Sequence, residues 1–392
     1  MNCKILTTFL VLLSTISQAQ TWTQVANFAG TERDDATAFV IGNTAYCLTG
    51  YEVGFAPTAN GAAFNGSTET WLPIQALPAG KERQYATSFA YNNYGYVLGG
   101  IGNTVLNDFW QYNPSSNTWL QLPNFPDSAI QGMSSFILNN KVYVVGGKRA
   151  SNHITNAVWE YNFSTNTWTQ KNNMPNNGMW RGAAFSIDSI GYVCFGITNN
   201  KAYNTVMYSY TSANDTWHKI NTAPLPQRKY VCTAVINGKA LLYGGQDSLN
   251  VFSNDLLSYN PTDSSFATHA GIPTIARRGA VAFALNNTLY ISTGINANYV
   301  RLNETWKNTQ FLFLNTKKQY NNTLTLYPNP ATHTLNVYAP FATQLMVYTI
   351  LGEVVQSIIT NGYSTILDIT ILSNGIYCIK TNTGQVAKFV KK

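Results

Sequence analysis

The chain has 392 residues and a formal net charge of +7, but only 10% of its residues are charged, whereas 13% are aromatic. This profile is typical of a β-rich extracellular protein and not of a cytosolic helical one. The basic residues form no Lys/Arg block, so we expect no nucleic-acid partner.

The first 19 residues are predicted to be a signal peptide. Lys4 precedes the apolar run ILTTFLVLLSTI, which is too short to span a membrane, and Ser17 and Ala19 occupy the −3 and −1 positions of a cleavage site. The mature chain is therefore expected to begin at Gln20. No later stretch is long and apolar enough to form a transmembrane segment.

An aromatic side chain returns at a fixed spacing along most of the chain. The steps are 49, 48, 49, 49 and 49 residues, and the positions are Trp22, Trp71, Trp119, Trp168, Trp217 and Phe266. A period near 50 residues indicates a repeat architecture. Each repeat contains four runs with strand character, which we call A to D. The turn between A and B holds Asn, Asp or Gly, which tolerate the positive φ of tight hairpins.

The order of these runs predicts a closed ring. Trp22 begins a D strand that has no A, B or C before it, and residues 277–314 supply A, B and C without a D. If the N-terminal strand joins the last repeat, the ring has six complete blades and no free edge. We therefore expect an all-β fold with a six-bladed propeller over residues 20–317.

The repeats resemble the kelch family. Gly-Gly doublets end strand B at 99–100, 146–147 and 244–245, and an aromatic residue of strand C precedes the repeated Trp or Phe by seven residues, at Tyr112, Tyr161, Tyr210 and Tyr259. The resemblance covers residues 21 to about 315. It implies that the repeated aromatic side chains pack between blades. The alternative is that they form platforms on which sugars stack.

Residues 318–392 follow a different pattern of alternating strands. The characteristic residues are Tyr327, Pro328, Asn329 and Pro330, then Gly352 and Glu353, then Gly375, Ile376 and Tyr377, and finally Lys388, Phe389, Val390, Lys391 and Lys392. They resemble the type A C-terminal sorting domain of the type IX secretion system. The resemblance implies a small β-sandwich, the type IX secretion machinery as a partner, and a secreted or cell-surface location. The alternatives are an unrelated ligand-binding sandwich and, for Lys391 and Lys392, a solvated tail instead of an export signal.

Four cysteines remain after the predicted cleavage, at Cys47, Cys194, Cys232 and Cys378. They lie in strand-like runs, and their spacing matches neither a metal site nor a dense disulfide framework. Buried free thiols and a structural disulfide both stay open as interpretations.

The D–A and B–C connections are expected on one face of the propeller, where variable loops on a rigid scaffold usually carry function. Five of the six D–A connections place an arginine eleven to thirteen residues after the repeated aromatic position. The candidate ligand-binding residues are Arg33, Arg83, Gln131, Arg181, Arg228 and Arg278, together with Glu52, Arg149, Asp247 and Arg301 in the B–C loops.

This arginine ring allows two interpretations. Guanidinium groups bind carboxylates through a planar fork, which favours an anionic ligand at the mouth of the channel. Alternatively, the arginines brace the D–A turns by donating hydrogen bonds to carbonyl groups. Acidic residues stand beside the ring in the sequence and are expected to neutralise part of its charge; they are Glu32, Asp34, Asp35 and Glu82.

Enzymatic hypotheses rest on resemblance. Galactose oxidase shares the kelch scaffold but needs copper held by two histidines and two tyrosines, and here only His153 is expected on the loop face, so we expect no metal and no cofactor. The kelch-type N-acetylneuraminate epimerase is a closer resemblance and implies an acid/base pair near a sugar ring. Our leading hypothesis is a non-catalytic module that binds a surface protein or a glycan. The alternative is a carbohydrate-active enzyme, an epimerase or mutarotase acting on an acidic sugar.

Overall fold

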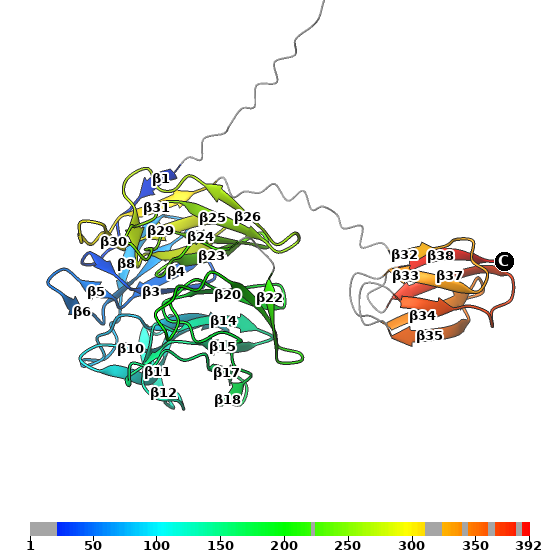
Figure 1. Ribbon diagram of the computed structural model, residues 1–392, viewed down its shortest axis with the longest axis horizontal. Helices are drawn as coiled ribbons and strands as arrows, with labels where there is room; N and C mark the ends of the chain where they lie inside the picture. The colour runs from blue at the N-terminus through cyan, green and yellow to red at the C-terminus, as the bar shows by residue number, and fades with distance from the viewer. Residues whose placement is uncertain (1–21, 221–223, 310–323, 339–343, 360–364, 382–385) are drawn as a thin grey trace, which may run out of the picture. The chain divides into compact units, whose positions relative to one another are not determined.

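In a computed structural model of the protein, the described residues are 22–220, 224–309, 324–338, 344–359, 365–381 and 386–392. The regular elements in these ranges are β-strands, and none of the described residues forms a helix long and apolar enough to cross a membrane. The chain divides into two compact units, Met1–Leu312 and Phe313–Lys392 (Figure 1). The predicted signal peptide and the predicted boundary after residue 317 lie outside the described residues and stay predictions.

The described part of the first unit contains six four-stranded antiparallel sheets. The first two consist of β3 (Thr37–Ile41), β4 (Thr44–Leu48), β7 (Gly61–Asn65) and β8 (Thr70–Ile74), and of β9 (Thr87–Tyr91), β10 (Tyr94–Ile101), β11 (Val105–Asn113) and β12 (Thr118–Leu122). The next two consist of β14 (Ser134–Leu138), β15 (Lys141–Val145), β17 (Val158–Asn162) and β18 (Thr167–Lys171), and of β19 (Ala183–Ile187), β20 (Ile190–Cys194), β21 (Met207–Thr211) and β22 (Thr216–Ile220). The last two consist of β23 (Cys232–Ile236), β24 (Lys239–Tyr243), β25 (Leu256–Asn260) and β26 (Ser265–His269), and of β28 (Val281–Leu285), β29 (Thr288–Ser292), β31 (Thr305–Asn308) and β1 (Trp22–Val25).

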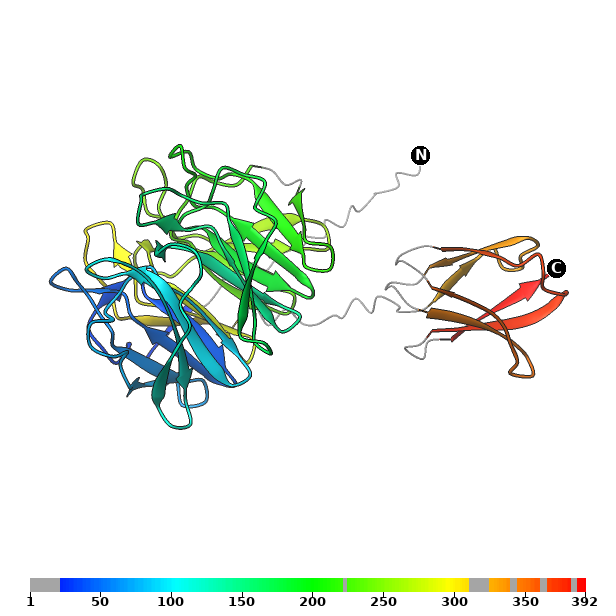
Figure 2. The same ribbon diagram turned by 90° about the horizontal axis from the view of Figure 1, so that it is seen from below.

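The sheets close into a ring. The innermost strands contact one another in the order β3, β9, β14, β19, β23, β28 and then β3 again. The N-terminal strand β1 pairs with β31, so that Trp22 lies opposite Asn308 and Val25 opposite Thr305 (Figures 1 and 2). The pairing predicted for the N-terminal strand is thus confirmed, and the first unit is a β-propeller in which we interpret each sheet as one blade.

The A–B turns explain why each repeat begins as a hairpin. All six contain at least one residue with a positive φ between 48° and 70°. These residues are Gly42, Asn92, Asn93, Asn139, Asn140, Asp188, Asn237, Gly238, Asn286 and Asn287. Asn, Asp and Gly adopt this conformation at low cost, and the resulting twist matches that of the flanking strands.

The repeated aromatic side chains join neighbouring sheets. The rings of Tyr112 and Trp119 lie 4.9 Å apart, and the Trp119 indole N–H donates to the Gln75 carbonyl of the preceding repeat at 2.9 Å. Trp217 makes the same contact with the Asn172 carbonyl at 3.0 Å. Both indoles are half-buried, and the contacts support the expected packing role of these two residues.

The described part of the second unit contains two antiparallel sheets. One consists of β32 (Thr325–Tyr327), β33 (Thr334–Tyr338) and β36 (Thr365–Asp368), and the other of β35 (Val354–Ile359), β34 (Gln344–Thr349), β37 (Gly375–Thr381) and β38 (Val386–Lys391). Leu335 and Leu367 from the first sheet and Val347 and Phe389 from the second share one buried apolar cluster, as expected for a small sandwich.

The motif residues of the second unit hold its C-terminal strand. The Asn329 side chain donates to the Lys388 carbonyl at 3.0 Å and accepts the Val390 N–H at 2.9 Å. Lys391 belongs to β38, is largely buried, and pairs with Gly375. Lys391 is therefore part of the sheet and not of a solvated tail.

The four described cysteines are free thiols. Cys47 and Cys194 are fully buried, and burial raises the pKa of the Cys47 thiol to about 12. The sequence left open buried free thiols and a structural disulfide, and the structure agrees with free thiols. A protonated buried thiol packs as a small apolar side chain.

Candidate functional site

Each D–A connection lies against a B–C loop, which places both sets on one face. In three repeats, short paired strands make this contact. The small sheets are β2 (Arg33–Asp34) with β5 (Tyr51–Glu52) and β6 (Ala56–Pro57), β13 (Ile130–Gln131) with β16 (Lys148–Arg149), and β27 (Arg277–Arg278) with β30 (Ile295–Asn296). Single bridges do the same in the other repeats, joining Gln84 to Ile101, Trp180 to Ile197 and Lys229 to Gln246. The predicted loop-rich face is therefore present.

Six residues, one from each D–A connection, surround the mouth of the channel on this face. All six have a positive φ between 56° and 64°, and we call them the mouth ring: Asp35, Tyr85, Gly132, Arg181, Tyr230 and Gly279. Successive members are joined by backbone hydrogen bonds, for example from Tyr85 N–H to the Asp35 carbonyl at 3.2 Å and from Arg181 N–H to the Gly132 carbonyl at 3.0 Å. The ring lines a cavity of about 130 Å³.

Arg83 shows what most of the predicted arginine positions do. Its side chain is 0% exposed, and it holds Asp108 through two hydrogen bonds of 2.6 and 2.9 Å. It also donates to the carbonyl groups of Gly99 at 3.1 Å and Lys81 at 2.8 Å. Every group that it reaches belongs to its own repeat, so Arg83 braces the D–A and B–C connections.

Three other arginines occupy equivalent places. Arg33 donates to the Thr49 and Asn60 carbonyls, each at 3.0 Å, and pairs with Glu52 at 2.6 Å. Arg228 binds Asp255 at 2.6 and 2.8 Å. Arg277, which directly precedes the predicted Arg278, binds Glu304 at 2.6 Å. Of the two open interpretations, the contacts of Arg33, Arg83 and Arg228 therefore agree with bracing. Glu52 is the carboxylate partner of Arg33.

Arg181 lies in the mouth ring and is held by aromatic rings instead of carboxylates. Its guanidinium carbon lies 3.7 Å from the ring centre of Trp180, 4.0 Å from that of Tyr85 and 4.4 Å from that of Tyr230. Its Nε–H has no hydrogen-bond partner among the described residues. Of the predicted ligand-binding residues, only Arg181 lines the mouth cavity.

Two lysines extend this cationic surface. Lys148 lies 5.0 Å from the Trp180 ring centre, and Lys229 lies 5.6 Å from that of Tyr230. Burial lowers the pKa of Lys229, and the nearby charges of Arg181 and Arg278 lower it further. Within the described residues, neither lysine nor Arg181 forms an ion pair with a carboxylate. We call Lys148, Arg181 and Lys229 the open cations.

An acidic pair faces the open cations across the mouth. Asp34 is 2% exposed and accepts a hydrogen bond from Arg301 Nε at 2.7 Å, while Arg278 lies 3.5 Å from Asp34 and 3.4 Å from Asp35. Burial and the neighbouring Asp35 carboxylate raise the pKa of Asp34 to about 7, despite the two arginines. Burial and the nearby Asp35 carboxylate likewise raise the pKa of Tyr85.

The remaining predicted residues lie away from the cavity. Gln131 is buried in β13 opposite Lys148, Arg149 pairs with Asp127 at 2.7 Å, and the Asp247 carboxylate accepts the N–H groups of its own loop. None of the three lines the mouth cavity. The expected single ring of arginines is therefore corrected to a bracing set and a smaller cluster at the mouth.

Sequence reasoning missed the aromatic residues of the mouth, Tyr85, Trp180 and Tyr230. One signal separates the two sets of arginines. The bracing residues Arg83, Arg228 and Arg277 have an acidic partner 25 or 27 residues later, whereas Arg181 has Val206 and Tyr208 at those distances.

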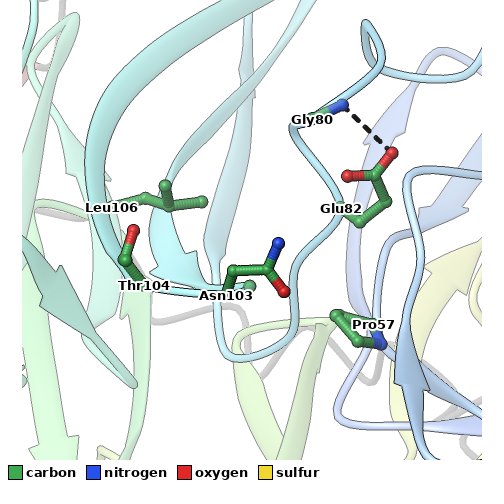
Figure 3. Close-up of a pocket in the computed structure, with 7 residues that line it drawn as sticks. Pro57, Gly80, Glu82, Asn103, Thr104 and Leu106 are labelled. Carbon is green, nitrogen blue, oxygen red and sulfur yellow. Dashed lines mark hydrogen bonds between the residues drawn. The ribbon is translucent and has the colours of Figure 1, made fainter.

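A smaller cavity of about 60 Å³ lies at the rim of the same face. Figure 3 shows Glu82 and Gly80 of a D–A connection opposite Asn103 and Thr104 of a B–C loop and Leu106 of β11. The Gly80 N–H donates to the Glu82 carboxylate at 3.1 Å. Glu82 thus accepts a hydrogen bond from its own connection, and it does not line the mouth cavity. Among the described residues, no group of three or more His, Cys, Asp and Glu side chains is arranged to hold a metal ion.

Comparison with known proteins agrees with this architecture. Residues 82–126 match the kelch motif, and residues 325–392 match a secretion system C-terminal sorting domain. The fold and the matches define a kelch β-propeller followed by a sorting domain for secretion. Residues 125–349 match the Attractin/LZTR1 beta-propeller family, to which this chain belongs.

Individual relatives cover less of the chain. N-acetylneuraminate epimerases of Shigella flexneri serotype 5b (strain 8401) and Escherichia coli (strain K12) are 36% identical over 83 residues, which make up 20% of this chain and 22% of each relative. The chain thus spans about a fifth of the length of these curated relatives. The solved structure of YjhT has a TM-score of 0.61 and 18% identity, covering 71% of this chain and 95% of its own. At that identity, the likeness shows the fold alone.

Proposed function

We propose that this protein is a secreted or cell-surface propeller that binds a carboxylate-bearing glycan at the mouth of its channel. The sorting domain supports export by the secretion machinery. One observation carries the ligand proposal: the open cations Lys148, Arg181 and Lys229 gather on aromatic rings beside a cavity, without carboxylate partners among the described residues.

The chemistry of these groups suits an acidic sugar. A guanidinium with an unused Nε–H donates to a carboxylate, and the interaction is stronger in a partly buried cavity than in water. A neutral sugar would leave the cations unpaired, so the site is expected to discriminate by charge.

Calorimetric titration of the full chain with N-acetylneuraminate, glucuronate and glucose tests the proposal. We expect binding of at least one acidic sugar, no binding of glucose, and a loss of about tenfold or more in affinity for Arg181→Ala. Lys201→Ala is the matched control, because Lys201 is an exposed cation at the tip of another loop of the same face. Equal affinity for acidic and neutral sugars, or equal loss in both variants, would contradict the proposal.

A second candidate function is an epimerase or mutarotase acting on the same acidic sugar. The observation that favours it is the Asp34–Asp35 pair, because a carboxyl group whose pKa of about 7 lies near the working pH is an efficient proton donor and acceptor. The local similarity to N-acetylneuraminate epimerases points the same way.

Exchange of the sugar anomers measured by NMR separates the two candidates. An enzyme accelerates the exchange, and Asp34→Asn abolishes the acceleration while the affinity for the sugar stays within about twofold. Binding without acceleration leaves the protein a binding module.

A further inference from the structure

Exposed apolar side chains gather on three loops of the propeller. In the described part of the first unit, eight large hydrophobic side chains are exposed to solvent. Six of them lie at the tips of three B–C loops, and two, Leu72 and Leu120, lie on D strands. We call the six residues the apolar loop surface: Val53, Phe55, Leu249, Val251, Tyr299 and Val300.

The three loops form one continuous surface. They belong to the fifth, sixth and first sheets, which are consecutive around the ring. Phe252 and Tyr299 contact each other with ring centres 6.5 Å apart, which joins the fifth loop to the sixth. Arg301 lies 5.0 Å from the ring centres of both Tyr51 and Phe55, which joins the sixth loop to the first.

These loops are held in fixed conformations by their own polar groups. The Asp247 carboxylate accepts the N–H groups of Leu249 and Val251, each at 2.8 Å. The Asn296 side chain accepts those of Asn298 at 2.9 Å and Val300 at 3.0 Å. A preorganised loop loses little conformational entropy on binding, so exposed apolar side chains on such loops are suited to docking.

The other half of the same face is polar. The exposed loop tips of the second, third and fourth sheets carry Asn103, Ser151, Asn152, Asn199, Asn200 and Lys201. Exposed apolar clusters are uncommon on soluble proteins unless something covers them. The uneven distribution therefore points to a specific occupant of one half of the face.

We infer that the apolar loop surface docks a protein partner that presents large apolar side chains beside a carboxylate. The surface is predominantly aliphatic, with Val53, Leu249, Val251 and Val300 offering no hydrogen bonds to a polyhydroxylated sugar. Of the charged groups in these loops, Glu52 pairs with Arg33 and Arg301 with Asp34, and the Asp247 carboxylate accepts N–H groups of its own loop. The inference goes beyond glycan binding, because none of the six apolar side chains belongs to the proposed glycan site, and only the border cation Lys229 is common to both.

The charge that we expect on the partner is inferred from the cationic residues that border the apolar loop surface. Arg278 lies 5.7 Å from the ring centre of Phe252 and 4.3 Å from that of Tyr230, so the apolar loops border the mouth. The open cation Lys229 also lies beside Tyr230. A carboxylate on the partner complements this cation, whereas a second copy of the chain would bring the same positive charges to the interface.

The test uses a phage-displayed library of 12-residue peptides selected on the full chain. We expect recovered peptides to combine Asp or Glu with several large apolar residues. Their affinity, measured by fluorescence anisotropy, is expected to fall about tenfold or more for the triple variant Phe55→Ser, Leu249→Ser, Val251→Thr. The matched control is Leu72→Ser with Leu120→Ser, which removes exposed apolar side chains elsewhere on the propeller and is expected to change the affinity less than about twofold.

Each other outcome overturns the inference. Failure to recover peptides, recovery of peptides without acidic residues, or equal binding by the two variants contradicts a carboxylate-bearing protein partner. Association with vesicles of phosphatidylcholine and phosphatidylglycerol that the triple variant loses would assign the surface to a membrane. Self-association lost in the triple variant, measured by analytical ultracentrifugation, would assign it to a second copy. Titration of the triple variant with acidic sugars keeps this test separate from glycan binding, which the variant is expected to retain.

Discussion

Replacement of Arg83 by alanine is the sharpest test of the division between bracing and open arginines. The side chain is 0% exposed and makes four hydrogen bonds, two of them to Asp108. Burial by itself raises the pKa of Asp108, but hydrogen bonds and charge from Arg83 bring it below its ordinary value. Without Arg83, the buried carboxylate keeps only the Trp110 indole N–H at 2.8 Å and Lys81 at 3.5 Å.

The expected cost follows from these contacts. Removal of one partner from a buried ion pair costs about 3–5 kcal/mol, because the remaining charge stays buried without compensation. For a unit of this size, 1 kcal/mol corresponds to about 2 °C in melting temperature, so Arg83→Ala is expected to lower the Tm by about 6–10 °C.

Arg181→Ala is the matched comparison. Arg181 makes no ion pair among the described residues, and its contacts with Trp180, Tyr85 and Tyr230 are cation–π interactions worth about 0.5–2 kcal/mol. Burial lowers the pKa of Arg181, so its removal also relieves the cost of a desolvated charge. We expect the Tm of the Arg181→Ala variant to lie less than about 3 °C below that of the wild type.

Differential scanning calorimetry of the full chain measures both values at one pH and one salt concentration. A Tm for Arg83→Ala within about 2 °C of wild type would refute the bracing role. Equal destabilisation by the two substitutions would refute the distinction between the bracing arginines and Arg181 at the mouth.

Three further predictions concern other parts of the molecule. Because the pKa of Asp34 is raised to about 7 in the folded state, its contribution to stability is complete below the ordinary carboxyl pKa of about 4 and is lost as the pH rises through about 7. In urea titrations from pH 4 to pH 8, we therefore expect the free energy of unfolding to decrease more for the wild type than for Asp34→Asn. Parallel pH profiles of the two proteins would contradict the assignment. Gly95→Ala is expected to destabilise the propeller by about 1–3 kcal/mol in the same assay, because a Cβ on Gly95 would lie 2.0 Å from the Phe39 ring. At Gly238, where nothing lies within 4 Å and φ is +70°, substitution by alanine measures instead the backbone cost of a Cβ without a steric clash. Asn329→Ala is expected to speed hydrogen exchange at the Val390 amide, which loses its acceptor, by a factor corresponding to about 1 kcal/mol, and unchanged protection would show that the motif does not hold the last strand.

The periodic features of this protein are determined by its sequence alone. The spacing of Trp22 to Phe266, the Asn and Gly residues of the A–B turns and the unpaired first strand are local or periodic signals, and they predicted the hairpins and the pairing of β1 with β31. Such signals are readable because a strand has a two-residue side-chain period and a tight turn needs a positive φ, whatever the rest of the chain does. The C-terminal motifs were equally local, and their residues hold the last strand of the second unit.

The division of labour among the arginines was decided by the tertiary structure. Arg83 and Arg181 both stand twelve or thirteen residues after a repeated tryptophan, but they differ by two places relative to the glycines that end the neighbouring B strand. The Arg83 side chain pairs with the Asp108 carboxylate of its own repeat, which neutralises its charge. The Arg181 residue lies instead in the mouth ring, where residues from different repeats meet. Position along the chain did not indicate that Tyr85 and Tyr230 would surround the Arg181 guanidinium, because these rings come from other repeats and reach it only when the ring of sheets closes.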